Sequence, residues 1–221
     1  MPGSWEIREQ NRVLCAILHV DTTTIAWSFG LRNLIVPGPI IPLAGMPFDH
    51  ARNVACKMAI QNGLEWLYFL DSDVVPPRDA VLRLMAHGKP IVSGMYRRRS
   101  PPVAVPVMLR GGQWITQFPP NQLIEVDLVG AGCLLVHRTV LERLPPQRPE
   151  AGKHWFDWRV DCAGLLPPGE CLSEDFTFCT WAKKKLGIPT LVDTSVRCRH
   201  IGFAEADGEG NWKPLEALPV T

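Results

Sequence analysis

Continuous apolar runs recur along the first half of the chain, and each is too short for an ordinary helix. Two of them span residues 12–20 and 65–70, and residues 90–96, which include Ser93, are expected to form the next strand. A run of this length that ends at polar or turn residues is typical of a strand buried on both faces, as in a parallel sheet. We therefore expect such a sheet, with further strands at 34–36 and 188–192.

Signals for helices lie between these runs. Each predicted helix begins at a capping residue or a proline, and several end at a glycine. In chain order the predicted starts are the polar cluster 21–24, Asp49, Pro77, Thr139 and Ser173. The helix that Asp49 caps is expected over residues 50–62, which places Arg52 and Asn53 in its first turn. A helix N-terminus favours phosphate, and an arginine can add a bidentate contact.

The pattern changes after residue 103. Short segments alternate there, Gly111 and Gly112 are expected to turn a hairpin, and residues 123–128 alternate apolar and polar positions with period two. We expect this half to be mixed or antiparallel.

Composition narrows the class of protein. The 221 residues are enough for one sizeable core, and we favour one domain. Lys and Arg (23) nearly balance Asp and Glu (22), so the net charge of +1 indicates neither a nucleic-acid partner nor an anionic membrane. No run approaches the roughly 20 apolar residues of a membrane span, and residues 1–11 lack a signal-peptide core. A cytoplasmic location is expected.

The seven cysteines are scattered without a Cys-x-x-Cys pair. They predict neither a disulfide framework nor a zinc site, and we expect reduced thiols.

Two carboxylates stand directly after the apolar run at 65–70. In the sequence Asp71-Ser72-Asp73, both acids can reach one hard cation, and ligands of open α/β sheets gather at the carboxyl ends of strands. Mg²⁺ is usually held by one or two carboxylates together with substrate phosphates. The motif therefore indicates a site for a metal diphosphate, while a simple turn before Pro76 and Pro77 is the alternative.

At this motif the sequence resembles the nucleotide-sugar-dependent glycosyltransferases of the GT-A fold, in particular family 2-like members. Their signature Asp-x-Asp follows a buried strand, and the resemblance extends from about residue 12 to 202. Four further motifs follow the family's order: Arg52-Asn53, Gly130-Ala131-Gly132, Glu174-Asp175 and the downstream His200.

The resemblance implies a single α/β domain of the Rossmann-like GT-A class over residues 1–221. Its central sheet would be mixed but mainly parallel and flanked by helices, with a small antiparallel portion on the acceptor side. The nucleotide-binding half would cover about 12–100, the acceptor half about 101–202, and a polar tail 203–221.

The resemblance also implies roles for individual residues. Asp175 would be the catalytic base and Glu174 an acceptor contact, and Asp71, Asp73 and His200 would be the metal ligands. The implied nucleotide or substrate contacts are Asp21, Thr22, Arg52, Asn53, Asp71, Ser72, Arg97, Gly130, Ala131 and Gly132. In the loop 145–172, Trp158 is a candidate for stacking on a sugar.

Simpler structural roles stand beside several of these assignments. Asp21 is also a natural helix cap, Arg97 belongs to a charge run typical of a solvated loop, Trp158 can anchor its loop to the core, and His200 can be a structural histidine.

The predicted activity is transfer of a sugar from a nucleoside diphosphate sugar to a hydroxyl of a glycan, lipid-linked or other acceptor. A divalent cation would stabilise the departing diphosphate, with Mn²⁺ favoured over Mg²⁺ if His200 is a ligand. One alternative is a sugar nucleotidyltransferase, which would want a glycine-rich basic loop where this chain has residues 19–24. The other is a non-catalytic module that binds sugar nucleotides or glycans.

Overall fold

The structure is a computed structural model that describes residues 12–19, 22–98, 105–152, 154–158, 172–201, 204–206 and 212–214. Its first half contains β1 (Val13–His19), α2 (Ile25–Asn33), β2 (Ile40–Ala44), α3 (Phe48–Gln61), β3 (Trp66–Asp71), β4 (Val74–Val75), α4 (Ala80–Ala86) and β5 (Ile91–Met95). Its second half contains β6 (Met108–Arg110), β7 (Gln113–Trp114), β8 (Leu123–Val126), β9 (Leu128–Val129), β10 (Cys133–His137), α5 (Arg138–Arg143), the 3₁₀ turn η1 (Pro149–Ala151), α6 (Glu174–Leu186), β11 (Thr190–Arg197), β12 (Arg199–His200), β13 (Ala204–Ala206) and β14 (Trp212–Pro214).

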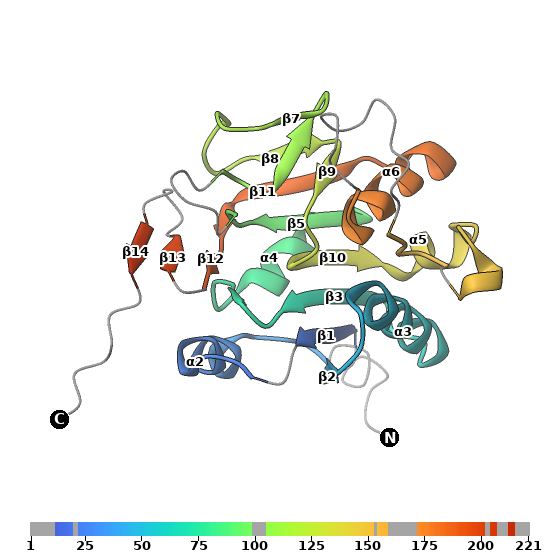
Figure 1. The fold of residues 1–221 in the computed structure, drawn as a ribbon, viewed down its shortest axis with the longest axis horizontal. Coiled ribbons are helices and arrows are strands. Elements are labelled where there is room, and N and C mark those ends of the chain that lie inside the picture. The colour runs from blue at the N-terminus through green and yellow to red at the C-terminus, as the bar shows by residue number, and fades with distance from the viewer. Residues whose placement is uncertain are drawn as a thin grey trace, which may run out of the picture.

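A seven-stranded sheet forms the centre, in the order β2-β1-β3-β10-β5-β11-β8 (Figure 1). Strands β1, β2, β3, β5 and β11 run in one direction, whereas β8 and β10 run in the other. The mixed, mainly parallel sheet that the resemblance implied is therefore confirmed. It is consistent with the Rossmann-like GT-A class.

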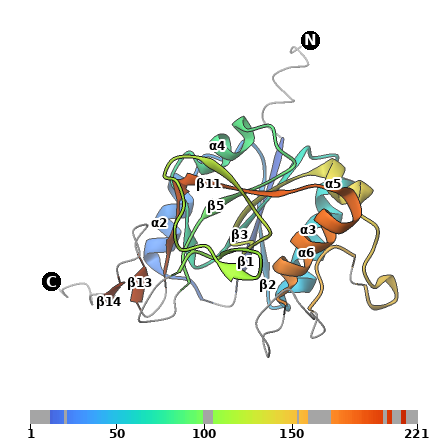
Figure 2. The same cartoon turned by 90° about the horizontal axis from the view of Figure 1, so that it is seen from above.

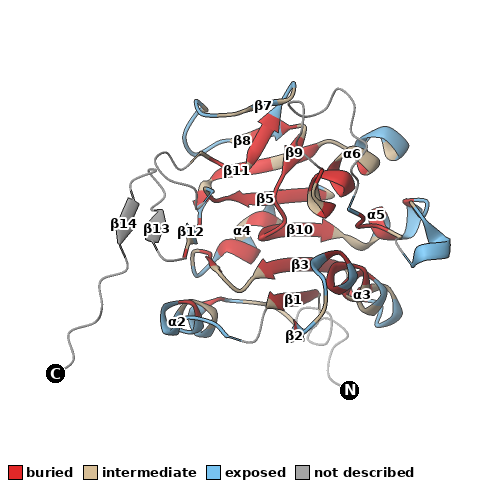
Figure 3. Cartoon of the chain, viewed as in Figure 1, coloured by how far each residue is buried: buried red, intermediate tan, exposed pale blue. Residues whose placement is uncertain are grey.

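Helices cover both faces of this sheet (Figure 2). Alternate residues of β1 and β3 point to opposite faces, so each strand contributes to two apolar cores. Leu14 and Phe69 pack in the core beneath α3, α5 and α6, whereas Cys15 and Tyr68 pack in the core beneath α2 and α4. The central strands β1, β3, β5 and β10 are buried, whereas the outer faces of the helices are exposed (Figure 3).

Two small antiparallel sheets complete the described structure. Strands β6, β7 and β9 form one of them, and Gly111 and Gly112 turn the predicted hairpin with φ values of 58° and 75°. The other has the order β14-β13-β12-β4 and lies beyond the carboxyl end of β3.

Some predicted elements differ from the structure. Residues 34–36 form no strand, and the neighbouring edge strand is β2, which contains Pro42. Proline lacks an amide donor and is tolerated at the edge of a sheet. Helix α3 begins at Phe48, so Asp49 is not its cap and Arg52 lies two residues further into the helix than expected. The cap of α5 is His137, whose side chain accepts from the amide of Thr139.

No helix in the described ranges combines the length and the apolar character that crossing a membrane requires.

Candidate functional site

The two motif carboxylates stand at the turn between β3 and β4. The amide of Ser72 donates to the carbonyl of Leu18 at 3.0 Å, which ties the turn to the end of β1. From α2, Trp27 fixes the turn with one indole N–H, which donates to the carbonyls of Asp71 (3.1 Å) and Val74 (3.0 Å). Asp71 and Asp73 are therefore held at the carboxyl edge of the sheet, where an open α/β sheet collects its ligands.

Arg52, on α3, binds two carboxylates and a backbone carbonyl from three other parts of the chain. Its side chain is 2% exposed, and Nη2 donates to Oδ1 of Asp71 at 3.0 Å while Nε donates to Oε1 of Glu174 at 3.1 Å. The third nitrogen, Nη1, donates to the carbonyl of Ala131 at 3.4 Å. The guanidinium thus joins α3, the end of β3, the glycine-rich loop before β10 and the start of α6.

Asp175 is bound to the same glycine-rich loop. Its Oδ2 accepts from the amide of Ala131 at 3.1 Å, and its Oδ1 accepts from the amide of Phe176 at 2.8 Å and from the hydroxyl of Ser173. Ser173 therefore bonds to Asp175 and makes no side-chain cap bond to α6. Unlike Glu174, which is 4% exposed, Asp175 is only partly buried.

Three carboxylates, those of Asp71, Glu174 and Asp175, lie around the buried Arg52, and this affects their protonation. Burial raises the pKa of Glu174 to about 7, with help from the charge of Asp175 and against the opposing effect of Arg52. Burial also raises the pKa of Asp71, and Asp73 and Asp175 add to the rise while Arg52 counteracts it. The excess of negative charge suits a bound cation or a retained proton.

Tyr96, at the end of β5, explains the two glycines of the Gly-Ala-Gly loop. Its hydroxyl accepts from the amide of Gly132 at 3.1 Å, and a Cβ on Gly130 would stand 2.0 Å from the same hydroxyl oxygen. A Cβ on Gly132 would meet Asp71 Oδ2 at 3.1 Å. The glycines thus let the backbone approach Tyr96 and the carboxylate turn, and an approach to a ligand stays a prediction.

His200 lies beside Asp73 because β12 pairs with β4, and the amide of Ile201 donates to the carbonyl of Asp73 at 2.7 Å. Its Nδ1 is 2.6 Å from the carbonyl oxygen of Arg97. Since a carbonyl only accepts, Nδ1 donates to it, and Nε2 lies 3.5 Å from Oδ1 of Asp73.

This pair fits a cation. Two ligands that each lie about 2.1 Å from one metal ion are separated by roughly 3 to 3.5 Å at octahedral or tetrahedral angles. The Nδ1 contact to a carbonyl is also the usual support for a metal-binding histidine. Within the described ranges, no three His, Cys, Asp or Glu side chains surround a single metal position. Of the three expected ligands, Asp73 and His200 face one another, while Asp71 is paired with Arg52.

The remaining predicted contacts lie apart from this cluster. Asn53 is buried and fixes the segment 154–158, since its amide nitrogen donates to the carbonyl of Phe156 at 2.7 Å and its oxygen accepts from the amide of Trp155 at 2.9 Å. Thr22 is exposed before α2, and Trp158 is 48% exposed. Asp21 lies outside the described residues.

Sequence reasoning missed two residues of the site. Tyr96 was placed in a strand without a role, yet it contacts the glycine-rich loop, and its ring packs edge-on against that of His200 with centroids 5.3 Å apart. Trp27 was treated only as a helix residue, although it binds the carboxylate turn. An aromatic residue at the carboxyl end of a predicted strand was the available signal for Tyr96. The sequence holds no comparable signal for Trp27.

Comparisons with known proteins bear on the fold. Neither a protein-family model nor a curated protein matches the sequence. Among solved structures, A197 from STIV is similar with a TM-score of 0.66 and 20% identity, over 93% of this chain and 95% of that chain. A glycosyltransferase involved in the glycosylation of the major capsid of PBCV-1 aligns with a TM-score of 0.33 and 14% identity, over 59% and 61% of the two chains. This second similarity is too weak to support a function. The chain therefore shares its fold with A197 along nearly its whole length.

Proposed function

We propose that the protein is a metal-dependent glycosyltransferase that moves a sugar from a nucleoside diphosphate sugar to an acceptor hydroxyl. The observation that carries the proposal is the meeting of three elements at one edge of the sheet. Asp73 ends the turn after β3, His200 faces it from β12, and Asp175 reaches the loop before β10 from α6. The resemblance of these motifs to the GT-A glycosyltransferases supports the same reading.

The negative charge of the site favours a cation that brings a diphosphate with it. Asp73 and His200 would hold the cation, and phosphate oxygens and water would complete its coordination. When bound, such a cation stabilises the charge that develops on the departing diphosphate. His200 supplies an imidazole ligand, which favours Mn²⁺ over Mg²⁺.

In the proposed reaction the acceptor oxygen bonds to the anomeric carbon, and the bond from that carbon to the diphosphate oxygen breaks with its electron pair. The proton of the acceptor hydroxyl goes to Asp175, which is a carboxylate exposed enough to be reached. Glu174 and Arg52 hold Asp71 and the start of α6 in position. The hydroxyl becomes more acidic as it bonds to the sugar, so a weak base suffices.

Calorimetric titration with nucleoside diphosphates in the presence of Mn²⁺ tests the proposal. Binding should be lost in EDTA and weakened at least about tenfold in Asp73→Ala, because the diphosphate then lacks the cation that links it to the protein. A matched control is Asp79→Ala, which removes a carboxylate that is exposed at the start of α4.

Hydrolysis of a panel of nucleoside diphosphate sugars with Mn²⁺ then separates an enzyme from a binding module. The proposal requires release of free sugar from at least one donor at a rate that falls in Asp175→Asn. Tight binding of a donor with no turnover, with or without acceptors, would identify a non-catalytic module instead. Binding of the nucleoside diphosphate with equal affinity in EDTA would refute the proposed metal dependence.

A further inference from the structure

Helix α2 carries an exposed stripe of apolar and basic side chains. Trp27 points inward and is 5% exposed, whereas Ile25 and Phe29 are 69% and 59% exposed. Arg32, also exposed, lies seven residues after Ile25. Positions i, i+4 and i+7 share one face of a helix, and Trp27 lies on the opposite face. The bond from Trp27 to the carboxylate turn fixes which face looks outward.

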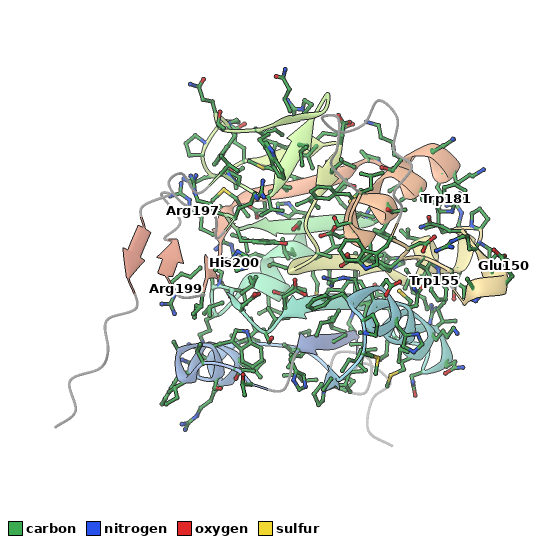
Figure 4. The ribbon with its side chains drawn as sticks, viewed as in Figure 1. Glu150, Trp155, Trp181, Arg197, Arg199 and His200 are labelled. Atoms are coloured by element: carbon green, nitrogen blue, oxygen red, sulfur yellow. The ribbon has the colours of Figure 1, made fainter. Side chains whose placement is uncertain are left out.

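A cavity of about 410 Å³ opens beside this stripe. It is lined by Phe29 and Gly30 from α2, by the residues that follow β4, and by the ends of β11 and β12. The charged residues that line it in the described structure are Arg78, Arg197 and Arg199, and all three are exposed. Arg197 and Arg199 lie at the same side of the molecule as α2, away from Trp155 and Trp181 (Figure 4).

The positive charge of this face is local. The whole protein has a net charge of only +1, so these arginines stand out against a nearly neutral molecule. Arg32 and Arg78 take part in none of the ion pairs found between described residues. The face therefore presents exposed apolar side chains beside two arginines, Arg32 and Arg78, that form no ion pair with another described residue.

We propose that this face, formed by Ile25, Phe29, Arg32, Arg78, Arg197 and Arg199, binds the surface of an anionic lipid membrane. An amphipathic surface lies at the interface with its apolar side chains among the acyl chains, while its basic side chains contact lipid phosphates. A soluble phosphate would satisfy the arginines alone and would leave Ile25 and Phe29 in water. Both parts of the face fit only an occupant with phosphates above an apolar layer.

Membrane contact at this face would also hold the candidate site close to the membrane surface. Trp27 connects the back of α2 directly to Asp71 and Val74, so the carboxylate turn follows the position of the helix. Acceptors in the plane of the membrane would then come within reach of the candidate site. The membrane contact itself does not depend on the proposed chemistry, because it uses other residues.

Vesicle flotation with the full-length protein tests the contact. We expect the protein to float with vesicles that contain phosphatidylglycerol and not with pure phosphatidylcholine, and to detach at high salt. In Arg32→Glu/Arg78→Glu the partition coefficient should fall about 30-fold or more, because each basic residue near an anionic surface contributes roughly a factor of five. In Ile25→Ser/Phe29→Ser it should fall at least about tenfold.

The matched control is Lys57→Glu/Arg143→Glu, which changes the net charge equally on the exposed surfaces of α3 and α5. This variant should float like the wild type, and unchanged melting temperatures would show that all variants are folded. If the control variant loses vesicle binding to the same extent, the loss is due to the change in net charge, and the proposal is overturned. The absence of flotation would also overturn the proposal. The same holds if the protein binds inorganic phosphate but no vesicles and if this phosphate binding is unchanged in Ile25→Ser/Phe29→Ser. Self-association of the wild type that Ile25→Ser/Phe29→Ser abolishes would likewise overturn it.

Discussion

Asp175 illustrates how a residue's contacts decide its role. Three donors fix its carboxylate at the start of α6, and the helix N-terminus stabilises the anion by about 0.3 to 1 kcal/mol. A purely structural Asp175 would contribute this small amount and nothing to the chemistry.

The variant Asp175→Asn separates the two roles. If Asp175 is the base, turnover should fall about 10²- to 10⁴-fold, while the lost helix-end charge lowers the melting temperature by only about 1 to 4 °C. Steady-state kinetics and thermal melts measure both. Asp79→Asn removes a charge at the start of α4 and should leave turnover unchanged. Near-native turnover in Asp175→Asn would reject it as the base and make Glu174 the next candidate.

Glu174 should make the stability of the fold depend on pH. Its pKa is about 7 in the folded protein against an ordinary value of 4.5, so the folded state binds the proton more tightly than the unfolded chain. The stability that this proton contributes is complete below about pH 4.5, declines as pH rises and is lost above about pH 7. The difference amounts to about 3 kcal/mol.

Urea unfolding of the wild type and of Glu174→Gln at pH 5 and pH 8 measures this effect. The wild type should lose up to about 3 kcal/mol relative to the variant between the two pH values, because glutamine has no proton to release. Parallel pH profiles for the two proteins would show that Glu174 is ionised throughout.

The sequence indicated which residues belong to the candidate site better than it indicated the contacts that those residues make. Asp71, Asp73, Asp175 and His200 could be named because motif spacing and order identify them. The burial of Arg52 could not be foreseen, because its partners Asp71, Ala131 and Glu174 lie 19, 79 and 122 positions away. Contacts over such distances are set by the arrangement of the elements.

Among the elements, strands buried on both faces were the most predictable. β1 and β3 are nearly continuous apolar runs in the sequence, and β5 is largely apolar, because α-helices cover both sides of them. The edge strand β2 was missed because it is partly exposed and contains Pro42, which reads as a loop. Helix starts were misplaced where an unexpected residue supplies the cap, as His137 does for α5.

The loop before β10 gives a prediction at this scale. In Gly130→Ala the new methyl would stand 2.0 Å from the hydroxyl oxygen of Tyr96, so the loop or the ring must shift. Overpacking of this kind costs about 1 to 3 kcal/mol. Because the loop also positions Asp175, turnover should fall with stability.

Tyr96→Phe provides the matched control by removing the hydroxyl. The double variant Gly130→Ala/Tyr96→Phe should be more stable than the sum of the two single changes predicts, by about 0.5 to 3 kcal/mol. Chemical denaturation of the four proteins measures this coupling. If the changes in the free energy of unfolding are strictly additive, the methyl group of Gly130→Ala does not clash with the hydroxyl of Tyr96.

For the whole molecule, the candidate site connects elements from both ends of the chain. Arg52 comes from α3, whereas Glu174 and His200 come from α6 and β12. A ligand bound there should stabilise the entire fold. At about 100 times its dissociation constant, a nucleoside diphosphate with Mn²⁺ adds about 2.7 kcal/mol, which raises the melting temperature by roughly 5 to 11 °C.

Differential scanning calorimetry with and without EDTA checks this expectation. The shift should appear as one transition that moves as a unit, and it should vanish when the metal is removed. A shift of equal size in EDTA would mean that the diphosphate binds without a cation.

The position of β10 has a consequence for the synthesis of this protein. β3 and β5 both belong to the first half of the chain, yet neither pairs with the other, since β10 lies between them and pairs with both. Until residues 133–137 have left the ribosome, each of these buried strands has an edge without a partner. Exposed apolar edges of this kind are prone to join other chains. We therefore expect nascent chains that are stalled before residue 133 to aggregate or to bind chaperones, and chains that extend beyond β11, which covers the other edge of β5, to be far less adhesive.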